Sequence, residues 1–448
     1  MSKSQASMGT KPIFPLLLSM SLPVMLSMLI QSLYNIVDGF WVAKLGTDAL
    51  TAVSLAFPLQ NVIMSVGVGM GIGISAQVSI CLGQGNHEAA SRTASLGTAL
   101  VFLHCIVFFL AGVFLTKPFL SMFTDDLTVL AWSCDYTRIV LCLSFGELVQ
   151  MCLEKTFQGA GKMLTTMFLM ASGCILNIIL DPILIFGLFG FPALGIRGAA
   201  YATVIGQFCG MFLYLLVYRF TDLGLHIHPR YAHFDRDLAR RIYGVAVPSS
   251  LMLAMPSVLT GLLNAILARI GAVYVAILGL YFKLQSFVNM PANGVIQGMR
   301  PIIGYNYGAG NYARVRRTVR FSLLLVAGIS AVGTVLAVFF PGPILSLFDA
   351  EPQLLREGSF ALQVIGPGFL LSTVSIVTCG VFEALGQGRN SLRISLMRQL
   401  ILLVPVGWLL SRFWGAAGIW VAFPIAELLT LFCSLLQLRR LLRSQLAS

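Results

Sequence analysis

Long apolar runs separated by short polar stretches recur along the whole chain. They lie at about 13–43, 50–80, 94–116, 128–157, 163–189, 196–218, 240–268, 274–303, 319–341, 358–383, 391–411 and 416–438. Each run is near or above the roughly 20 residues that an α-helix needs to cross a bilayer. Several are longer, which predicts tilt, kinks or extension beyond the membrane. The pattern predicts an all-α polytopic membrane protein with twelve transmembrane helices.

Composition agrees with this prediction and excludes other classes. Hydrophobic residues make up 57% of the 448 residues and charged residues only 10%, against about 25% charged in soluble domains. The net charge of +12 could indicate a nucleic-acid partner. However, the basic residues flank the apolar runs and form no groove-sized patch. We therefore expect the protein to lie in a lipid bilayer and to bind no nucleic acid.

The basic residues also predict an orientation. With a cytoplasmic N-terminus, 20 of the 29 Lys and Arg residues fall on the inner side. The positive-inside rule therefore predicts a multi-pass protein of the cell inner or plasma membrane with both termini in the cytoplasm. We expect no cleavable signal peptide, because the first apolar run is too long and contains an acid. The only long polar stretch, 219–241, is predicted to be a cytoplasmic linker.

The two halves of the chain repeat at a spacing of 225 residues. Pro23 matches Pro248, Gly46 matches Gly271, and many loop and glycine positions coincide in the same way. A duplicated six-helix unit inserts twice with the same orientation. We therefore predict a parallel internal repeat around a central cavity, with an N-terminal lobe (1–218), an inter-lobe linker (219–239) and a C-terminal lobe (240–448).

Small residues are expected to control helix packing. In the glycine-rich run 67–75, Gly67 and Gly71, and Gly69 and Gly73, are spaced four residues apart. Such pairs let helices approach closely in membranes. A nucleotide-binding loop is the less favoured interpretation, because no strand precedes the run and no Lys-Ser/Thr pair follows it.

An acid inside the first apolar run is the first functional signal. Asp38 would cost roughly 2.5–3.5 kcal/mol to insert, so such residues usually face a cavity or a partner. Pro23 in the same run removes a backbone hydrogen bond, and we predict that it acts as a hinge.

The motif LNIILDPILIFG, 176–187, is the second signal. Asn177 and Asp181 are four residues apart and share one helix face. Counting from the predicted helix ends places Asp38, Asp181 and Thr203 at similar heights. We predict one cation-coupling site; separate acids, each with its own hydrogen bond, are the alternative.

The second half lacks this set of acids. At the same spacing Asp38 becomes Leu263, Asn177 becomes Leu402, and Asp181 becomes Val406. A structural role would be expected in both halves, whereas an ion site is needed only once.

Other polar residues lie within the apolar runs. Lys283, near mid-membrane, replaces Pro58 of the first half and is too deep to reach the interface easily. Glu147, Glu383 and Glu427 either neutralise a neighbour or act directly. The candidate residues for a substrate cavity are Tyr34, Gln60, Glu147, Lys283 and Gln285.

Five segments together resemble the multidrug and toxic compound extrusion (MATE) family, in particular its MepA-like branch. They are YNIVDGFWVAKLG (34–46), LGQGN (82–86), LNIILDPILIFG (176–187), GIRGAAYATV (195–204) and RPIIGYNYGAGN (300–311). The resemblance implies a twelve-helix antiporter that exports amphipathic, mainly cationic compounds by alternating access, using a proton or sodium gradient.

The resemblance also implies a site. Asp38, Asn177, Asp181 and Thr203 match the family's cation-binding set, and they would be metal ligands only if sodium is the coupling ion. No cofactor beyond the transported ion and no enzymatic activity is expected, and the protein is expected to be a monomer. Some members place a coupling acid in helix seven, but 247–271 contains none.

Two other interpretations stay open. A lipid-linked-precursor flippase or metabolite exporter of the same superfamily would share the fold, although flippases tend to have a strongly cationic cavity. An enzyme would need a nucleophile–base or metal set at one depth, and only His104 among the histidines is intramembrane. A channel would not explain acids confined to one half of a repeat.

Overall fold

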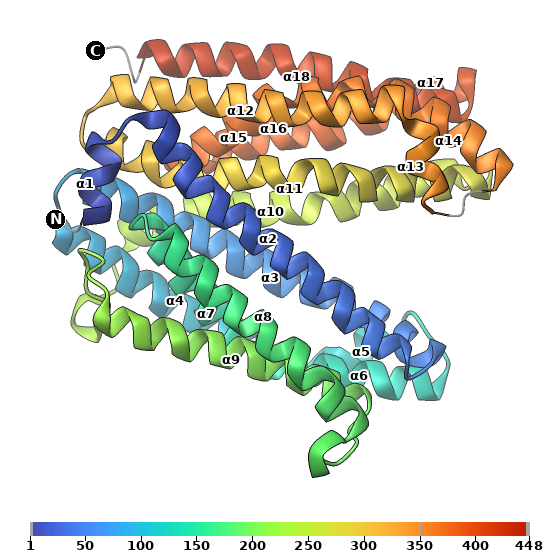
Figure 1. The fold of residues 1–448 in the computed structure, drawn as a ribbon, viewed down its shortest axis with the longest axis horizontal. Helices are drawn as coiled ribbons and strands as arrows, with labels where there is room; N and C mark the ends of the chain where they lie inside the picture. The colour runs from blue at the N-terminus through green and yellow to red at the C-terminus, as the bar shows by residue number, and fades with distance from the viewer. Residues whose placement is uncertain (1–2, 349–350, 445–448) are drawn as a thin grey trace. The chain divides into compact units, whose positions relative to one another are not determined.

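The computed structural model describes residues 3–348 and 351–444, and its regular elements there are all helical (Figure 1). The α-helices are α1 Lys3–Thr10, α2 Ile13–Ala43, α3 Thr47–Gly83, α4 His87–Phe114, α5 Thr116–Leu120, α6 Leu127–Cys142, α7 Phe145–Gly159, α8 Met163–Phe186, α9 Ile196–Phe220, α10 Arg236–Leu267, α11 Ala272–Gly308, α12 Tyr312–Phe339, α13 Pro341–Ser346, α14 Pro352–Ile365, α15 Pro367–Ala384, α16 Gly388–Leu396, α17 Leu403–Trp414 and α18 Ala416–Ser444. Short 3-10 turns are η1 Leu188–Gly190 and η2 Pro229–Tyr231, and a π-helical turn, η3 Met397–Leu402, joins α16 to α17.

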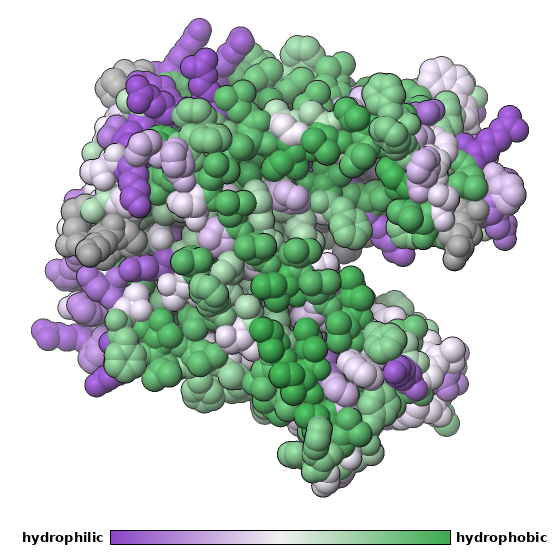
Figure 2. Space-filling model, in the orientation of Figure 1, coloured by the Kyte–Doolittle hydropathy of each residue, from purple (hydrophilic) through white to green (hydrophobic). Residues whose placement is uncertain are grey.

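The predicted number of membrane spans is confirmed. Among the described residues, eleven helical segments are long and apolar enough to cross a membrane. Helices α6 and α7, bent by 45° at their junction, form a twelfth when they are counted as one broken span. Figure 2 shows hydrophobic side chains covering the helix flanks, with hydrophilic side chains gathered toward helix ends, as expected for a polytopic membrane protein.

The chain forms two compact units. Unit 1 contains Leu26–Ser250 with the N-terminal segment through Gly9, and unit 2 contains Thr10–Met25 and the chain from Leu251 onward. Helices α2 and α10 are therefore each divided between the units. The predicted lobes 1–218 and 240–448 rest on the repeat and stay a prediction.

Proline marks both points of division. Pro23 lies two residues before Met25, and Pro248 lies two residues before Ser250. Both helices continue through their prolines. A proline removes one backbone hydrogen bond and so weakens the helix locally.

Glycine contacts hold the exchanged helix ends in place. In unit 1, a methyl group on Gly69 would lie 2.7 Å from the carbonyl oxygen of Ala246 in α10. In unit 2, a methyl group on the repeat-related Gly294 would lie 3.3 Å from the backbone nitrogen of Met25 in α2. The packing role predicted for the glycine-rich run is confirmed for Gly69, which lies directly against α10.

The π-helical turn changes the register of the repeat. Gly198 packs against the carbonyl of Leu184, and the equivalent Gly418 packs against the carbonyl of Leu410. The two leucines, which precede the following loop, are 226 residues apart, whereas the expected spacing is 225; η3 has therefore added one residue. The two glycines, which follow that loop, are 220 residues apart. A π-turn accommodates one extra residue.

This register corrects the sequence-based alignment. The positions equivalent to Asn177 and Asp181 are Leu403 and Gly407 instead of Leu402 and Val406. The conclusion drawn from that alignment is unchanged, because neither Leu403 nor Gly407 carries an acid.

We predict that Gly198→Ala and Gly418→Ala each destabilise the protein by about 1–3 kcal/mol. At both sites the new methyl group would meet a backbone carbonyl that cannot rotate away. Thermal unfolding in detergent should show lower midpoints for both variants. Gly328→Ala in α12 is the matched control, because open space surrounds it and alanine favours the helix. Unchanged midpoints at both sites would contradict the tight packing.

Candidate functional site

Polar side chains from α8 and α9 meet inside unit 1. The Asn177 side-chain amide donates a hydrogen bond to Oγ1 of Thr203, with a distance of 3.4 Å. Both residues are buried, and Asp181, one turn after Asn177, is fully buried with 0% exposure. The structure thus brings together three of the four residues predicted to form the coupling site.

A glycine contact explains why these two helices lie so close. A methyl group on Gly206 in α9 would lie 3.0 Å from the carbonyl oxygen of Gly173 in α8 and 3.2 Å from Cβ of Asn177. Gly173 lies one turn before Asn177, and Gly206 lies about one turn after Thr203. The backbones can approach because both positions lack a side chain.

Asp38 of α2 completes the set. Its charge acts on Asp181, and both carboxylates act on the phenol groups of Tyr34 and Tyr136. The Thr203 hydroxyl interacts with both phenols. Two carboxylates that share an apolar pocket resist joint ionisation. The cluster is therefore more stable with a proton or another cation bound than with both carboxylates ionised and no cation.

Several oxygen atoms in the cluster have no hydrogen-bond partner within the described part of the chain. They are Oδ1 of Asp38, Oδ1 of Asn177 and both carboxylate oxygens of Asp181. Buried polar atoms are normally satisfied, so this concentration requires an explanation. Carboxylate and amide oxygens are hydrogen-bond acceptors and also the ligands that hard cations prefer. The arrangement can accept a proton or coordinate a small cation.

Tyr136 of α6 belongs to this cluster, although the sequence analysis missed it. It is 2% exposed, and its hydroxyl accepts a hydrogen bond from Nε2 of Gln60 at 3.1 Å. This contact brings Gln60, predicted as a cavity residue, to the cluster around Asp38 and Asp181. A sequence signal existed, because the equivalent position at a spacing of 225 is Ala361. The comparison that singled out Asp38 would also have found Tyr136.

The other predicted site residues lie elsewhere. Glu147 in α7 interacts with Gln207 of α9. In unit 2, Nε2 of Gln285 donates to the hydroxyl of Tyr281 at 2.9 Å. The ammonium of Lys283 lies 6.0 Å from the ring centre of Phe348.

Two candidate acids of unit 2 are paired with arginine. Glu383 forms an ion pair with Arg300, and Glu427 lies 3.7 Å from Nε of Arg398. Both acids thus neutralise a neighbour, which was one of the two interpretations of these residues. Asp38 and Asp181 form no ion pair within residues 3–348 and 351–444. Among these described acids, Asp38 and Asp181 of unit 1 lie together without a basic partner, whereas Glu383 and Glu427 of unit 2 each have one.

Comparison with known proteins identifies the family. The MatE family profile matches residues 23–183 and 248–409, which is well over half of the chain. This protein belongs to the MatE family, and its two matched segments correspond to the internal repeat. Members of the family are membrane transporters and not enzymes.

Curated relatives align over almost the whole length. An FAD transporter of Shewanella oneidensis is 28% identical over 433 residues, which cover 95% of this chain and 94% of the relative. The multidrug export protein MepA of Staphylococcus haemolyticus is 27% identical over 428 residues, covering 94% and 92%.

Solved structures show the same fold. A MATE protein in complex with MaL6 matches with a TM-score of 0.91 at 24% identity over 100% of both chains. A MATE protein in a bent conformation matches with a TM-score of 0.92 at 24% identity, covering 99% of this chain and 98% of the other. These matches confirm the predicted fold class.

We predict that Asp181→Asn raises the free energy of unfolding by roughly 0.5–2 kcal/mol. A buried carboxylate without a hydrogen-bond partner is a source of instability, and an amide removes its charge. Asp135→Asn is the control, because Asp135 pairs with Arg197 at 2.7 Å near the surface, so its loss should be neutral or slightly destabilising. Thermal unfolding of both variants checks this, and a lower midpoint for Asp181→Asn would assign that residue a structural role.

Proposed function

We propose that this protein is a multidrug efflux antiporter that uses a proton or sodium gradient. The observation that carries the proposal is the cluster of Asp38, Asn177, Asp181 and Thr203 in unit 1. Within the part of the chain that the structure describes, it contains two acids without a basic partner and four oxygen atoms without a hydrogen bond. A reversible cation site has this composition, whereas a structural ion pair has a fixed internal counter-charge.

The cluster can drive transport by shifting a conformational equilibrium. A cation neutralises the repulsion between Asp38 and Asp181, so α2 and α8 pack together more favourably when the cation is bound. The coupling ion needs only to bind one conformation more tightly than the other. Pro23, beside the point where α2 passes from unit 2 into unit 1, is the proposed hinge.

The same residues fit either coupling ion. A proton would be shared between the two carboxylates, with Tyr34 and Tyr136 beside them as hydrogen-bond partners. A sodium ion would take oxygen ligands from Asp38, Asn177, Asp181 and Thr203, a set of the hard oxygens that such ions prefer. Neither ion requires a prosthetic group.

Amphipathic, mainly cationic compounds are the proposed substrates. The name of the staphylococcal relative, multidrug export protein MepA, supports drug export, and the cationic class rests on the resemblance to the MATE family. The name of the Shewanella relative, FAD transporter, favours a second candidate, export of an anionic metabolite. A lipid-linked-precursor flippase is the third possibility. The proposed location is the plasma or inner membrane, with a monomeric protein and both termini in the cytoplasm.

We predict that Asp38→Asn abolishes gradient-driven efflux while the protein still reaches the membrane and binds drug. The substitution removes one of the two acids and therefore the site's ability to exchange a cation. Asp181→Asn should be nearly as damaging, and Asn177→Ala milder. Dye efflux from proteoliposomes under an imposed pH or sodium gradient measures the effect and also distinguishes the two coupling ions.

The control for this experiment is Asp48→Asn, which removes an exposed acid from the first turn of α3. It should transport normally. Full efflux by a well-folded Asp38→Asn protein would place the coupling site elsewhere, and Glu147 would then be the next residue to test.

A separate prediction concerns Lys283. Its ammonium lies in a membrane-spanning helix and forms no ion pair within the described residues, so it is free to meet a ligand. Lys283→Ala should change the substrate range or rate while expression and thermal stability stay close to those of the wild type. Lys117→Ala, at an exposed lysine in α5, is the control. Unchanged transport of every compound tested would exclude a role in recognition.

A further inference from the structure

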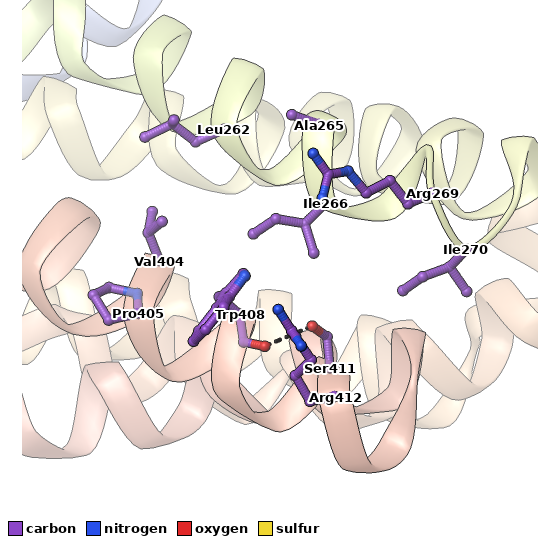
Figure 3. Close-up of a pocket in the computed structure, with 10 residues that line it drawn as sticks. All are labelled: Leu262, Ala265, Ile266, Arg269, Ile270, Val404, Pro405, Trp408, Ser411 and Arg412. Carbon is purple, nitrogen blue, oxygen red and sulfur yellow. Dashed lines mark hydrogen bonds between the residues drawn. The ribbon is translucent and has the colours of Figure 1, made fainter.

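A groove in unit 2 lies between the second half of α10 and α17 (Figure 3). Its cavity volume is about 530 Å³, within the range of small-molecule sites. Leu262, Ile266 and Val404 line its apolar part, and Arg269, Trp408 and Arg412 line the end near the α10–α11 loop. Figure 3 shows the two arginine side chains extending from opposite helices toward the space beside Trp408.

The polar lining consists mainly of hydrogen-bond donors. Two guanidinium groups and one indole N–H have no acceptor role, and the Ser411 hydroxyl already donates to the carbonyl oxygen of Trp408 at 2.7 Å. The guanidinium of Arg412 lies 4.7 Å from the ring centre of Trp408. Neither arginine forms an ion pair with any described residue. Within residues 3–348 and 351–444, the groove thus carries two positive charges that form no ion pair.

The equivalent region of unit 1 is filled by aromatic side chains. Trp41 of α2 packs edge-to-face on Phe186 of α8, with ring centres 6.0 Å apart. The Lys44 ammonium lies over Phe40 and Trp41, 4.6 and 4.7 Å from their ring centres. Three aromatic rings and a lysine therefore occupy this place.

Unit 2 replaces these residues one by one. At a spacing of 225, Phe40 becomes Ala265, Trp41 becomes Ile266 and Lys44 becomes Arg269; beyond the π-turn, Phe186 becomes Arg412. Loss of the three rings opens the groove. The positive charge of Lys44 is kept at Arg269, where Ala265 and Ile266 replace its two aromatic partners. A second charge is gained at Arg412, whose guanidinium lies over Trp408. The groove is therefore a specific difference between the two repeats and no general consequence of the fold.

Depth along the helices identifies the occupant. Arg269 lies two residues after the end of α10 at Leu267, and Arg412 lies two residues before the end of α17 at Trp414. Leu262 and Val404 lie seven and eight residues deeper, or about 10 and 12 Å at the helical rise of 1.5 Å per residue. Arginine and tryptophan at helix ends are typical of the headgroup level, with apolar residues facing the acyl chains.

We propose that this groove binds an anionic phospholipid, with its phosphate between Arg269 and Arg412 and one acyl chain along Leu262, Ile266 and Val404. A zwitterionic lipid has a positively charged group in its headgroup, which Arg269 and Arg412 would repel. A cationic drug would be repelled. Each arginine should favour an anionic headgroup about fivefold near the membrane surface.

Tryptophan fluorescence of the full-length protein tests the proposal. The protein is reconstituted in phosphatidylcholine bilayers that contain increasing fractions of either phosphatidylglycerol or phosphatidylcholine with brominated acyl chains, which quench nearby tryptophan. Quenching by phosphatidylglycerol should saturate at a severalfold lower lipid fraction. The Trp408→Phe variant should lose this steep component, because Trp408 is the tryptophan on the groove.

The Arg269→Gln/Arg412→Gln variant should bind both lipids equally. Arg138→Gln/Arg356→Gln is the matched control: it removes two exposed arginines outside the groove and should keep the preference. Ala265→Phe keeps both arginines and places a ring where unit 1 has Phe40. It should reduce the steep component because the ring blocks the groove.

Two results would overturn the proposal. One is a phosphatidylglycerol preference that survives both the arginine variant and Ala265→Phe. The other is an absent preference in the wild type; efflux of an anionic dye that depends on Arg269 and Arg412 would then assign the groove to a transported anion. Both outcomes are independent of the Asp38 experiment, because that experiment measures coupling in unit 1.

Discussion

The exclusion of water from the membrane interior controls where this chain can place a polar side chain. A buried charge must meet an opposite charge, a network of hydrogen bonds or a ligand. Unit 2 uses the first solution, since Glu383 and Glu427 lie beside Arg300 and Arg398. Unit 1 does not use it for Asp38 and Asp181. An acid paired with a basic side chain is always neutralised. Two neighbouring acids without a base are neutralised only when a cation binds.

The internal repeat separates the roles of the two units. Glycine contacts recur in both, at Gly69 and Gly294 and at Gly198 and Gly418, because any side chain there would collide with a neighbouring helix. The chemistry between those contacts differs. Unit 1 has acids and phenols, with the paired rings of Trp41 and Phe186 further along the same helices, and unit 2 has an open, positively charged groove. One backbone arrangement thus holds a cluster of acids in unit 1 and a cluster of basic side chains in unit 2.

Much of the fold could be predicted because its signals are local. Each apolar run is long enough to cross a membrane, and a duplication leaves matching prolines and glycines in the sequence itself. The broken span of α6 and α7 was predicted as a single helix, because its apolar run continues through the bend of 45°. The exchange of the ends of α2 and α10 between the units was not predicted, since it depends on which helix each end packs against.

For the candidate site too, some features could be predicted from the sequence and others depend on how the helices pack. Sequence by itself predicted that Asp38, Asp181 and Thr203 lie at a similar depth, because helical rise converts residue number into height. It also showed that the counterparts of Asp38 and Asp181 in the second half are not acids. Tertiary structure decided the rest: Gly173 and Gly206 bring Asn177 to Thr203, Tyr136 joins the cluster and brings Gln60 with it, and the π-turn shifts the second repeat by one residue. These features depend on contacts between helices, and spacing along a single helix cannot show them.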